Sequence, residues 1–110
     1  MGISKSEIFS EQQNMIANFA KAFGHPARVA IIQKLFKIDG CVCGDLVDEI
    51  GLAQATISQH LRELKQLGLI KGTVEGTSVC YCIDEENWTS MKETMAELLN
   101  LDIKSKTGCC

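Results

Sequence analysis

The stretch from residue 53 to residue 70, AQATISQHLRELKQLGLI, constrains the fold more than any other part of this sequence. Apolar side chains recur in it at helical spacing and would form one face of a helix: Ile57, Leu61, Leu64 and Leu67. On the opposite face lie Ala55, Gln59, Arg62 and Gln66, with Ser58 at the edge. These small, amide and guanidinium groups are of the kinds that enter a major groove and bond to base edges or phosphates. An ordinary amphipathic surface helix would show the same apolar stripe. The flanking segments must therefore distinguish a DNA-recognition helix from such a surface helix.

The segments on both sides favour a helix-turn-helix. Upstream, residues 45–50 are predicted to form a short helix and Gly51 a tight turn after it. Downstream, Gly68 is predicted to end the long helix. Residues 69–74 and 78–83 are predicted to form the two strands of a tight hairpin. Helix, glycine turn, helix and hairpin follow one another in this order in a winged helix-turn-helix.

Helical periodicity continues outside this motif. Residues 4–23 are predicted to form one helix, with a capping box of Ser4 and Glu7 at its start. Pro26 is well placed to begin the next helix, and Asp84 to cap the last one. The apolar stripe of that last helix consists of Trp88, Met91, Met95 and Leu98. The expected fold is mainly α with a β-hairpin wing, a winged helix-turn-helix with the element order ααααββα.

Residues 1–103 are expected to form one winged helix-turn-helix domain for DNA binding and dimerisation, and residues 104–110 a flexible tail that contains cysteines. The first and last helices carry apolar stripes of which the central motif needs only a part. We therefore expect these two helices to form a homodimer interface. A dimer would place its recognition helices on half-sites of double-stranded operator DNA about one helical turn apart.

Charge and hydropathy narrow the class of protein. The formal net charge of -3 argues against tight non-specific DNA binding. Local charge matters more, and the predicted reading helix and its flank carry Arg62, Lys65 and Lys71 against Glu63. A hydrophobic content of 45% and a charged content of 23% describe a globular chain. Because no apolar run reaches transmembrane length and no signal peptide opens the chain, we expect a cytoplasmic protein.

The 6 cysteines fall in close pairs: Cys41 and Cys43, Cys80 and Cys82, Cys109 and Cys110. Partners this close in sequence make strained, easily reduced disulfides, so we expect reduced thiols. Cys43 would lie near a helix N-terminus, where the helix dipole favours the thiolate, and thiolate pairs suit soft ions. Cys41 and Cys43 are therefore candidate metal ligands; the alternative is a pair of small, half-buried apolar residues. Cys80 and Cys82 share one side of a predicted strand and are interpreted as packing residues.

The sequence resembles the ArsR/SmtB family of metalloregulatory repressors over about residues 15–100. GHPARVAIIQKL resembles the family's second-helix signature, and TISQHLRELKQLGLI resembles its recognition helix. VEGTSVCYCI resembles its wing, and CVCGDL resembles its arsenic-type metal loop. The resemblance implies a homodimeric winged-helix repressor without a permanent cofactor. It implies that the repressor leaves its operator when a thiophilic ion binds, for this motif arsenite (trivalent arsenic) or trivalent antimony.

The residues expected to meet DNA are Gln54, Thr56, Ser58, Gln59, His60, Arg62, Lys65, Lys71 and Thr77. His60 lies at the edge of the apolar stripe and is expected to be partly buried and hydrogen-bonded, helping to place the recognition helix. His25 is expected to cap a helix break. Arginine is missing from the wing tip, where Glu75 and Thr77 stand, so wing contact with phosphates is expected to be weak.

The chain departs from the family's arsenic loop, which usually runs CVCDL followed by a further cysteine. Here Gly44 precedes Asp45, and Val47 stands in the region of that further cysteine. Trivalent arsenic prefers three sulfur ligands, so the tail is the expected source of the third, with idle tail thiols as the alternative. The expected metal ligands are therefore Cys41, Cys43, Cys109 and Cys110. No histidine follows His60, so we expect no zinc site on the last helix.

Two other functions remain compatible with the cysteines. In the first, the same repressor responds when Cys41 and Cys43 oxidise or form a polysulfide link. In the second, the chain is a dithiol oxidoreductase or a metal-transfer protein. A thioredoxin-like enzyme would show C-x-x-C in a βαβ context, which this sequence lacks. Since the sequence shows no catalytic triad or paired-carboxylate pattern either, we expect no enzyme.

Overall fold

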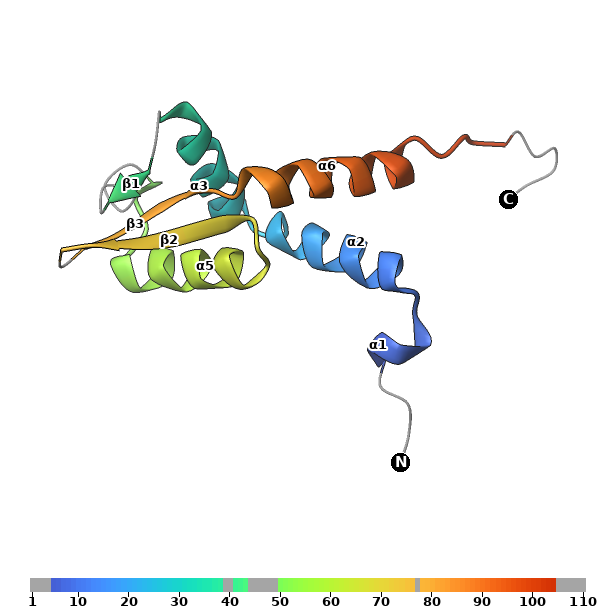
Figure 1. The fold of residues 1–110 in the computed structure, drawn as a ribbon, viewed down its shortest axis with the longest axis horizontal. Helices are drawn as coiled ribbons and strands as arrows, with labels where there is room; N and C mark the ends of the chain where they lie inside the picture. Colours follow the sequence, from blue (N-terminus) through green and yellow to red (C-terminus); the bar gives the residue numbers. More distant parts are fainter. Residues whose placement is uncertain (1–4, 39–40, 44–49, 77, 105–110) are drawn as a thin grey trace.

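The computed structural model describes residues 5–38, 41–43, 50–76 and 78–104 (Figure 1). Its elements are α1 (Lys5–Ile8), α2 (Glu11–Ala22), α3 (Pro26–Lys37), β1 (Val42–Cys43), α5 (Gln54–Gln66), β2 (Ile70–Glu75), β3 (Ser78–Ile83) and α6 (Glu85–Leu99). The mainly α class, the long helix and the hairpin wing are confirmed. The short helix predicted over 45–50 lies, apart from residue 50, outside the described residues.

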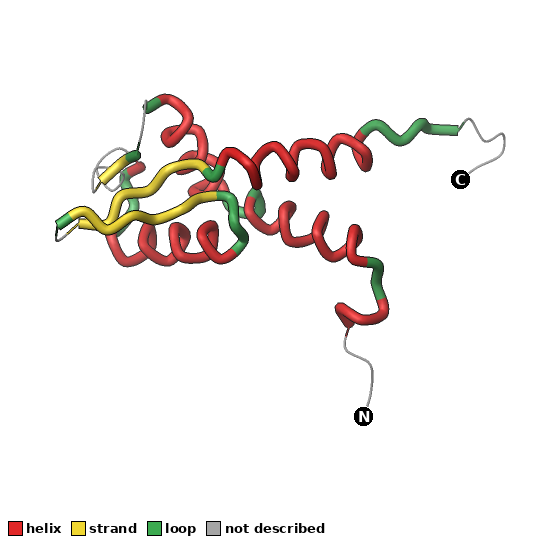
Figure 2. The backbone as a smooth tube through the Cα atoms, viewed as in Figure 1, coloured by secondary structure: helices red, strands yellow, loops and turns green. Residues whose placement is uncertain are grey.

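The strands form an antiparallel sheet in the order β1-β3-β2 (Figure 2). The hairpin pairs Ile70 with Ile83 at one end and Glu75 with Ser78 at the other. Strand β1 was not predicted. It adds to the free edge of β3, with Cys43 opposite Cys80. The segment that carries the CVC motif is therefore part of the wing sheet.

The core lies between α3, α5, the sheet and α6. Its buried residues are Ala22, Ile31, Ile32, Leu35, Ile57, Leu61, Leu64, Leu69, Ile70 and Met91. The apolar stripe predicted for α5 is confirmed, because Ile57, Leu61 and Leu64 are buried in this cluster. Burial of one such side chain stabilises the fold by roughly 1.5–3 kcal/mol. This burial fixes which face of α5 remains exposed.

Side-chain caps set the helix boundaries. The prediction of one helix over 4–23 is wrong, because α1 ends at Ile8 and a second helix, capped by Ser10, starts at Glu11. The Ser10 hydroxyl accepts a hydrogen bond from the amide of Gln13 at 3.1 Å, and the Gln13 side chain accepts one from the amide of Ser10 at 2.9 Å. This capping box replaces the one predicted with Ser4, a residue outside the described ranges.

The caps predicted for the other helices are confirmed. His25 caps α3, with its Nδ1 accepting a hydrogen bond from the amide of Ala27 at 3.0 Å. Asp84 caps α6, with its carboxylate accepting one from the amide of Asn87 at 3.1 Å. Each cap satisfies an amide that the first turn of a helix leaves without a partner.

Helices α2 and α6 lie side by side and extend away from the sheet (Figures 1 and 2). Gln12 donates a hydrogen bond to Glu97 at 2.7 Å, and the rings of Phe23 and Trp88 meet edge to face. Large apolar side chains are exposed on these arms and the adjoining segments: Ile8, Phe9, Leu98, Leu99, Leu101 and Ile103. The uncovered apolar surface predicted for the two ends of the chain is therefore present. Within the described ranges, no helix is long and apolar enough to cross a membrane.

The turn after α5 yields a test of the fold. Gly68 has a φ of +86°, and a Cβ there would lie 3.0 Å from the side-chain nitrogen of Asn87. That nitrogen donates a hydrogen bond to the Gly68 carbonyl at 2.8 Å. We expect Gly68→Ala to lower the free energy of unfolding, measured with urea, by about 2–3 kcal/mol, because left-handed strain of roughly 1–2 kcal/mol adds to the collision.

Gly51→Ala is the matched control. Gly51 has a similar φ of +83°, but no atom of the described residues lies within 4 Å of the Cβ position. This variant should lose only the strain, about 1 kcal/mol. If both variants lose the same free energy of unfolding, the contact with Asn87 does not contribute to the loss.

Candidate nucleic-acid interface and thiol site

Helix α5 presents a polar face to solvent. Among the residues predicted to meet DNA, those exposed on this helix are Gln54, Ser58, Gln59, Arg62 and Lys65, and Lys71 is exposed on β2. Thr56 is half-buried, and Thr77 lies outside the described residues. Ala53 is the N-cap residue of α5, and its methyl side chain provides no capping hydrogen bond. These exposed groups remain the predicted DNA contacts.

His60 differs from these exposed residues, and its contact with DNA stays a prediction. Its side chain is only 9% exposed and packs against α3, where its ring lies 4.5 Å from the ring of His25. Arg28 donates a hydrogen bond from Nε to His60 Nδ1 at 3.1 Å. The burial predicted for His60 is confirmed, and the contact between α3 and α5 makes it a positioning residue.

Arg28 is the residue that sequence reasoning missed. Its guanidinium forms an ion pair with Glu63 of α5 and donates a hydrogen bond to the Lys21 carbonyl at 2.8 Å. Together with the bond to His60, these contacts tie the end of α2, the start of α3 and the middle of α5 to one side chain. Glu63 and His60 lie far from Arg28 in sequence, so no local pattern could reveal these contacts.

The Arg28–His60 contact predicts a dependence of stability on pH. Burial, together with the nearby His25 and Arg28, lowers the pKa of His60. Below about pH 6.5 the unfolded chain binds a proton at this histidine before the folded chain does. Stability should therefore fall as the pH is lowered through this window, since protonated Nδ1 cannot accept from Arg28.

His60→Gln is the variant that tests this linkage, because an amide oxygen can accept the same hydrogen bond without titrating. Urea unfolding at about pH 8 and about pH 5 should show a smaller acid loss of stability in this variant than in the wild-type chain. His25 is present in both proteins and serves as an internal control. Parallel losses in the two proteins would contradict the assignment to His60.

The cysteines differ from the sequence-based expectation. Cys41 and Cys82 form a disulfide, with their Cα atoms 4.5 Å apart and a sequence separation of 41. Cys80 is fully buried and is also disulfide-bonded. The expectation of reduced thiols, and the interpretation of Cys80 and Cys82 as packing residues alone, are therefore wrong. The reason is that pairing of β1 with β3 brings together cysteines that are distant in sequence.

The predicted tail ligands, Cys109 and Cys110, lie outside the described residues. Among the residues that the structure describes, no group of three or more His, Cys, Asp or Glu side chains is gathered as around a metal ion. Cys43 is placed only by its backbone, opposite Cys80 in the ladder.

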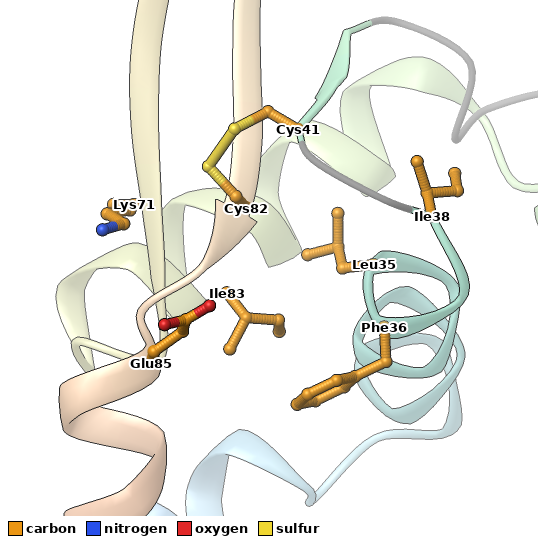
Figure 3. A pocket seen from close by; sticks show the side chains of 8 residues that line it. All are labelled: Leu35, Phe36, Ile38, Cys41, Lys71, Cys82, Ile83 and Glu85. Atoms are coloured by element: carbon orange, nitrogen blue, oxygen red, sulfur yellow. A yellow bond between two sulfur atoms is a disulfide. The ribbon is translucent and has the colours of Figure 1, made fainter.

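A pocket of about 460 Å³ opens beside the disulfide. Its lining residues are Leu35, Phe36, Ile38, Cys41, Lys71, Cys82, Ile83 and Glu85 (Figure 3). The sulfur atoms form one edge, apolar side chains of α3 form another, and Lys71 and Glu85 lie across from them (Figure 3). The disulfide is therefore at a surface that small solutes can reach.

The exposed polar helix with its hairpin wing places this protein in the class of winged helix-turn-helix DNA-binding regulators. The same fold is seen in the solution structure of Mb0332 from Mycobacterium bovis, a homodimeric winged helix-turn-helix DNA-binding domain. The two share 22% of their residues and superpose with a TM-score of 0.64, over 94% of this chain and 98% of that one.

Sequence comparison identifies the family. Residues 25–71 match the profile described as "Bacterial regulatory protein, arsR family". An HTH-type transcriptional regulator of Methanocaldococcus jannaschii, MJ1325, is 38% identical over 90 residues, which are 80% of this chain and 99% of the relative. The cadmium resistance transcriptional regulatory protein CadC homolog of Staphylococcus aureus is 35% identical over 92 residues, 82% of this chain and 74% of the relative. The chain belongs to the ArsR family of transcriptional regulators.

Proposed function

We propose that this chain is a cytoplasmic homodimeric repressor that releases its operator DNA when arsenite binds its cysteine thiolates, with trivalent antimony as the other candidate ion. The observation that carries the proposal is the position of the CVC motif. Strand β1, which contains Cys43, pairs with β3 of the wing, and the wing follows the exposed helix α5. A ligand at the cysteines would therefore act directly on the sheet that supports the DNA-reading surface.

The exposed face of α5 supports the DNA-binding part of the proposal. Gln59 and Arg62 lie on it, and both side chains have the donor geometry that reads base edges in the major groove. Lys65 and Lys71 add positive charge for phosphates nearby. The net charge of -3 on the whole chain implies that binding depends on specific contacts more than on bulk attraction.

The uncovered apolar arms support the dimer. Leu99 is 74% exposed and Ile103 is 98% exposed, beyond the part of α6 that packs against the core. A second copy is the partner that would bury these side chains, because α2 and α6 extend away from α5 and the sheet (Figure 1) and would leave them free for DNA. A dimer would also present two copies of α5 to two half-sites.

The thiols support an inducer that is thiophilic. Reduced Cys41 and Cys43 would supply sulfur ligands, and Cys109 or Cys110 of the tail would supply the third. Soft ions prefer such ligands to oxygen and nitrogen. A relative of this chain from Staphylococcus aureus is named as a cadmium resistance regulator, and cadmium is also a thiophilic ion. The ion can release DNA only by binding the free state more tightly than the DNA-bound state.

The test is fluorescence anisotropy of the reduced protein on a duplex taken from upstream of its own gene. We expect saturable binding that saturating arsenite weakens by about 10-fold or more, in the usual range of allosteric coupling. The Cys41→Ser/Cys43→Ser double variant should bind the same duplex and keep it when arsenite is added.

Each of the other outcomes would reject one part of the proposed function. Release of DNA from the double variant by arsenite would remove Cys41 and Cys43 from the site. Binding that arsenite leaves unchanged in the wild-type chain would reject the inducer and keep the DNA reader. No binding even at low salt would reject α5 as a reading helix.

A further inference from the structure

We infer that Cys41 and Cys82 form a reversible disulfide that withdraws Cys41 from the thiophilic site and so blocks the response to arsenite, while DNA binding persists. This inference rests on the proposed function for its consequence. The pair itself rests on the structure alone. It assigns a redox modification to two cysteines that share no local sequence motif.

Strand pairing brings the two residues together. Cys43 lies opposite Cys80 and Val42 opposite Tyr81 in the ladder between β1 and β3, so Cys41 follows in register opposite Cys82. The Cα atoms of Cys41 and Cys82 are 4.5 Å apart, a separation at which a disulfide can form without movement of the backbone. The pairing of β1 with β3 thus places the two cysteines within bonding distance of each other.

Both sulfurs can be reached from solvent. Cys41 is exposed, Cys82 is half-buried, and both line the pocket of Figure 3. Lys71, the Cα partner of Cys82 on β2, lines the same pocket, and an ammonium group favours a nearby thiolate. Glu85 also lines it and opposes this effect with its negative charge. Exposure and a cationic neighbour are the conditions under which cysteines react with small oxidants.

A peroxide is the class of oxidant that this pair would use. The Cys41 thiolate attacks the O–O bond to form a sulfenic acid, and an alcohol or water leaves. The Cys82 thiolate then attacks that sulfur, and water leaves as the S–S bond forms. In total, two thiols and one peroxide yield one disulfide, one water and one alcohol or second water. Two equivalents of a low-molecular-weight thiol return the pair to the reduced state and are themselves joined in a disulfide.

Formation of the disulfide and binding of arsenite would compete for the same sulfur of Cys41. A sulfur in a disulfide has no thiolate to offer to a soft ion. The DNA-reading surface is nevertheless intact in the disulfide form, because α5 keeps its polar face exposed while Cys41 and Cys82 are bonded. The oxidised protein should therefore bind its operator and ignore arsenite.

The experiment uses the full-length protein treated with hydrogen peroxide and digested under non-reducing conditions. Mass spectrometry should find the peptide of Cys41 linked to that of Cys82. In anisotropy, the oxidised protein should bind the duplex within about 2-fold of the reduced protein, and arsenite should change its affinity by less than about 2-fold. A thiol reductant should restore the full arsenite response.

Two variants make the test specific. In Cys82→Ser, the sulfenic acid at Cys41 has lost its partner, so dimedone should trap it in higher yield than in the wild-type chain. Val79→Ser changes an exposed residue of the same strand and keeps every sulfur, so it should form the linked peptide as the wild-type chain does.

Three results would overturn the inference: a link from Cys41 to another cysteine, no gain of dimedone adduct in Cys82→Ser, or normal arsenite release from fully linked protein. A reduced wild-type chain that never responds to arsenite would instead reject the proposed function. The peptide map would still decide whether Cys41 and Cys82 are the oxidised pair.

Discussion

We expect the Arg62→Ala variant to bind operator DNA about 10- to 100-fold more weakly than the wild-type chain in fluorescence anisotropy. Arg62 is exposed on the polar face of α5, and a guanidinium that bonds to a base edge contributes roughly 1–3 kcal/mol. Because the side chain lies outside the core, its loss should leave urea unfolding unchanged within about 0.5 kcal/mol.

The salt dependence of binding separates the two kinds of contact that Arg62 could make. Loss of a phosphate contact should lower the slope of log affinity against log salt by about 1, whereas loss of a base contact should leave the slope and relax base preference. Lys104→Ala removes the same charge from an exposed residue after α6 and should weaken binding by less than about 2-fold. Similar losses in both variants would mean that only net charge matters.

The second large effect concerns the Cys41–Cys82 disulfide. Closing a loop between residues 41 apart in sequence removes unfolded-state entropy worth about 4 kcal/mol at 25 °C. Full reduction of the wild-type chain should therefore lower its free energy of unfolding by at least about 3 kcal/mol, measured by urea unfolding with and without a metal-free phosphine reductant.

The single variant Cys82→Ser should lose less than full reduction does. Cys80 is also disulfide-bonded, and its bond would continue to restrain the unfolded chain. The variant under oxidising conditions should therefore lie between the oxidised and the reduced wild-type chain. If reduction leaves the free energy of unfolding of the wild-type chain unchanged, the disulfide does not stabilise the fold.

Local patterns predicted the parts of the fold that local physics decides. The stripe of α5 follows from helical periodicity, and His25 and Asp84 cap their helices through backbone amides two or three residues away. The break before α2 shows the limit of such patterns. A serine followed three residues later by Glu or Gln occurs twice near the start of the chain, and the box at Ser10 sets the boundary of α2.

Long-range pairing decided the rest. Arg28 meets Glu63 and His60 only after α3 packs against α5. Cys41 meets Cys82 only after β1 joins β3, and a strand of two residues has too little periodicity to be recognised from sequence. Spacing in the sequence pairs each cysteine with its nearest neighbour, whereas in the structure Cys41, just before β1, is bonded to Cys82 on β3.

The bond between Cys41 and Cys82 also makes the middle of the chain a closed ring, inside which α5 and β2 lie. A protease that cuts one peptide bond within this ring opens it without releasing either fragment, because the sulfur bridge still joins them. On a denaturing gel without reductant, the nicked protein would run as one molecule, and with reductant as two. In the oxidised state, a single cut in α5 or β2 therefore leaves one covalently joined protein. In the reduced state the same cut divides it into two fragments.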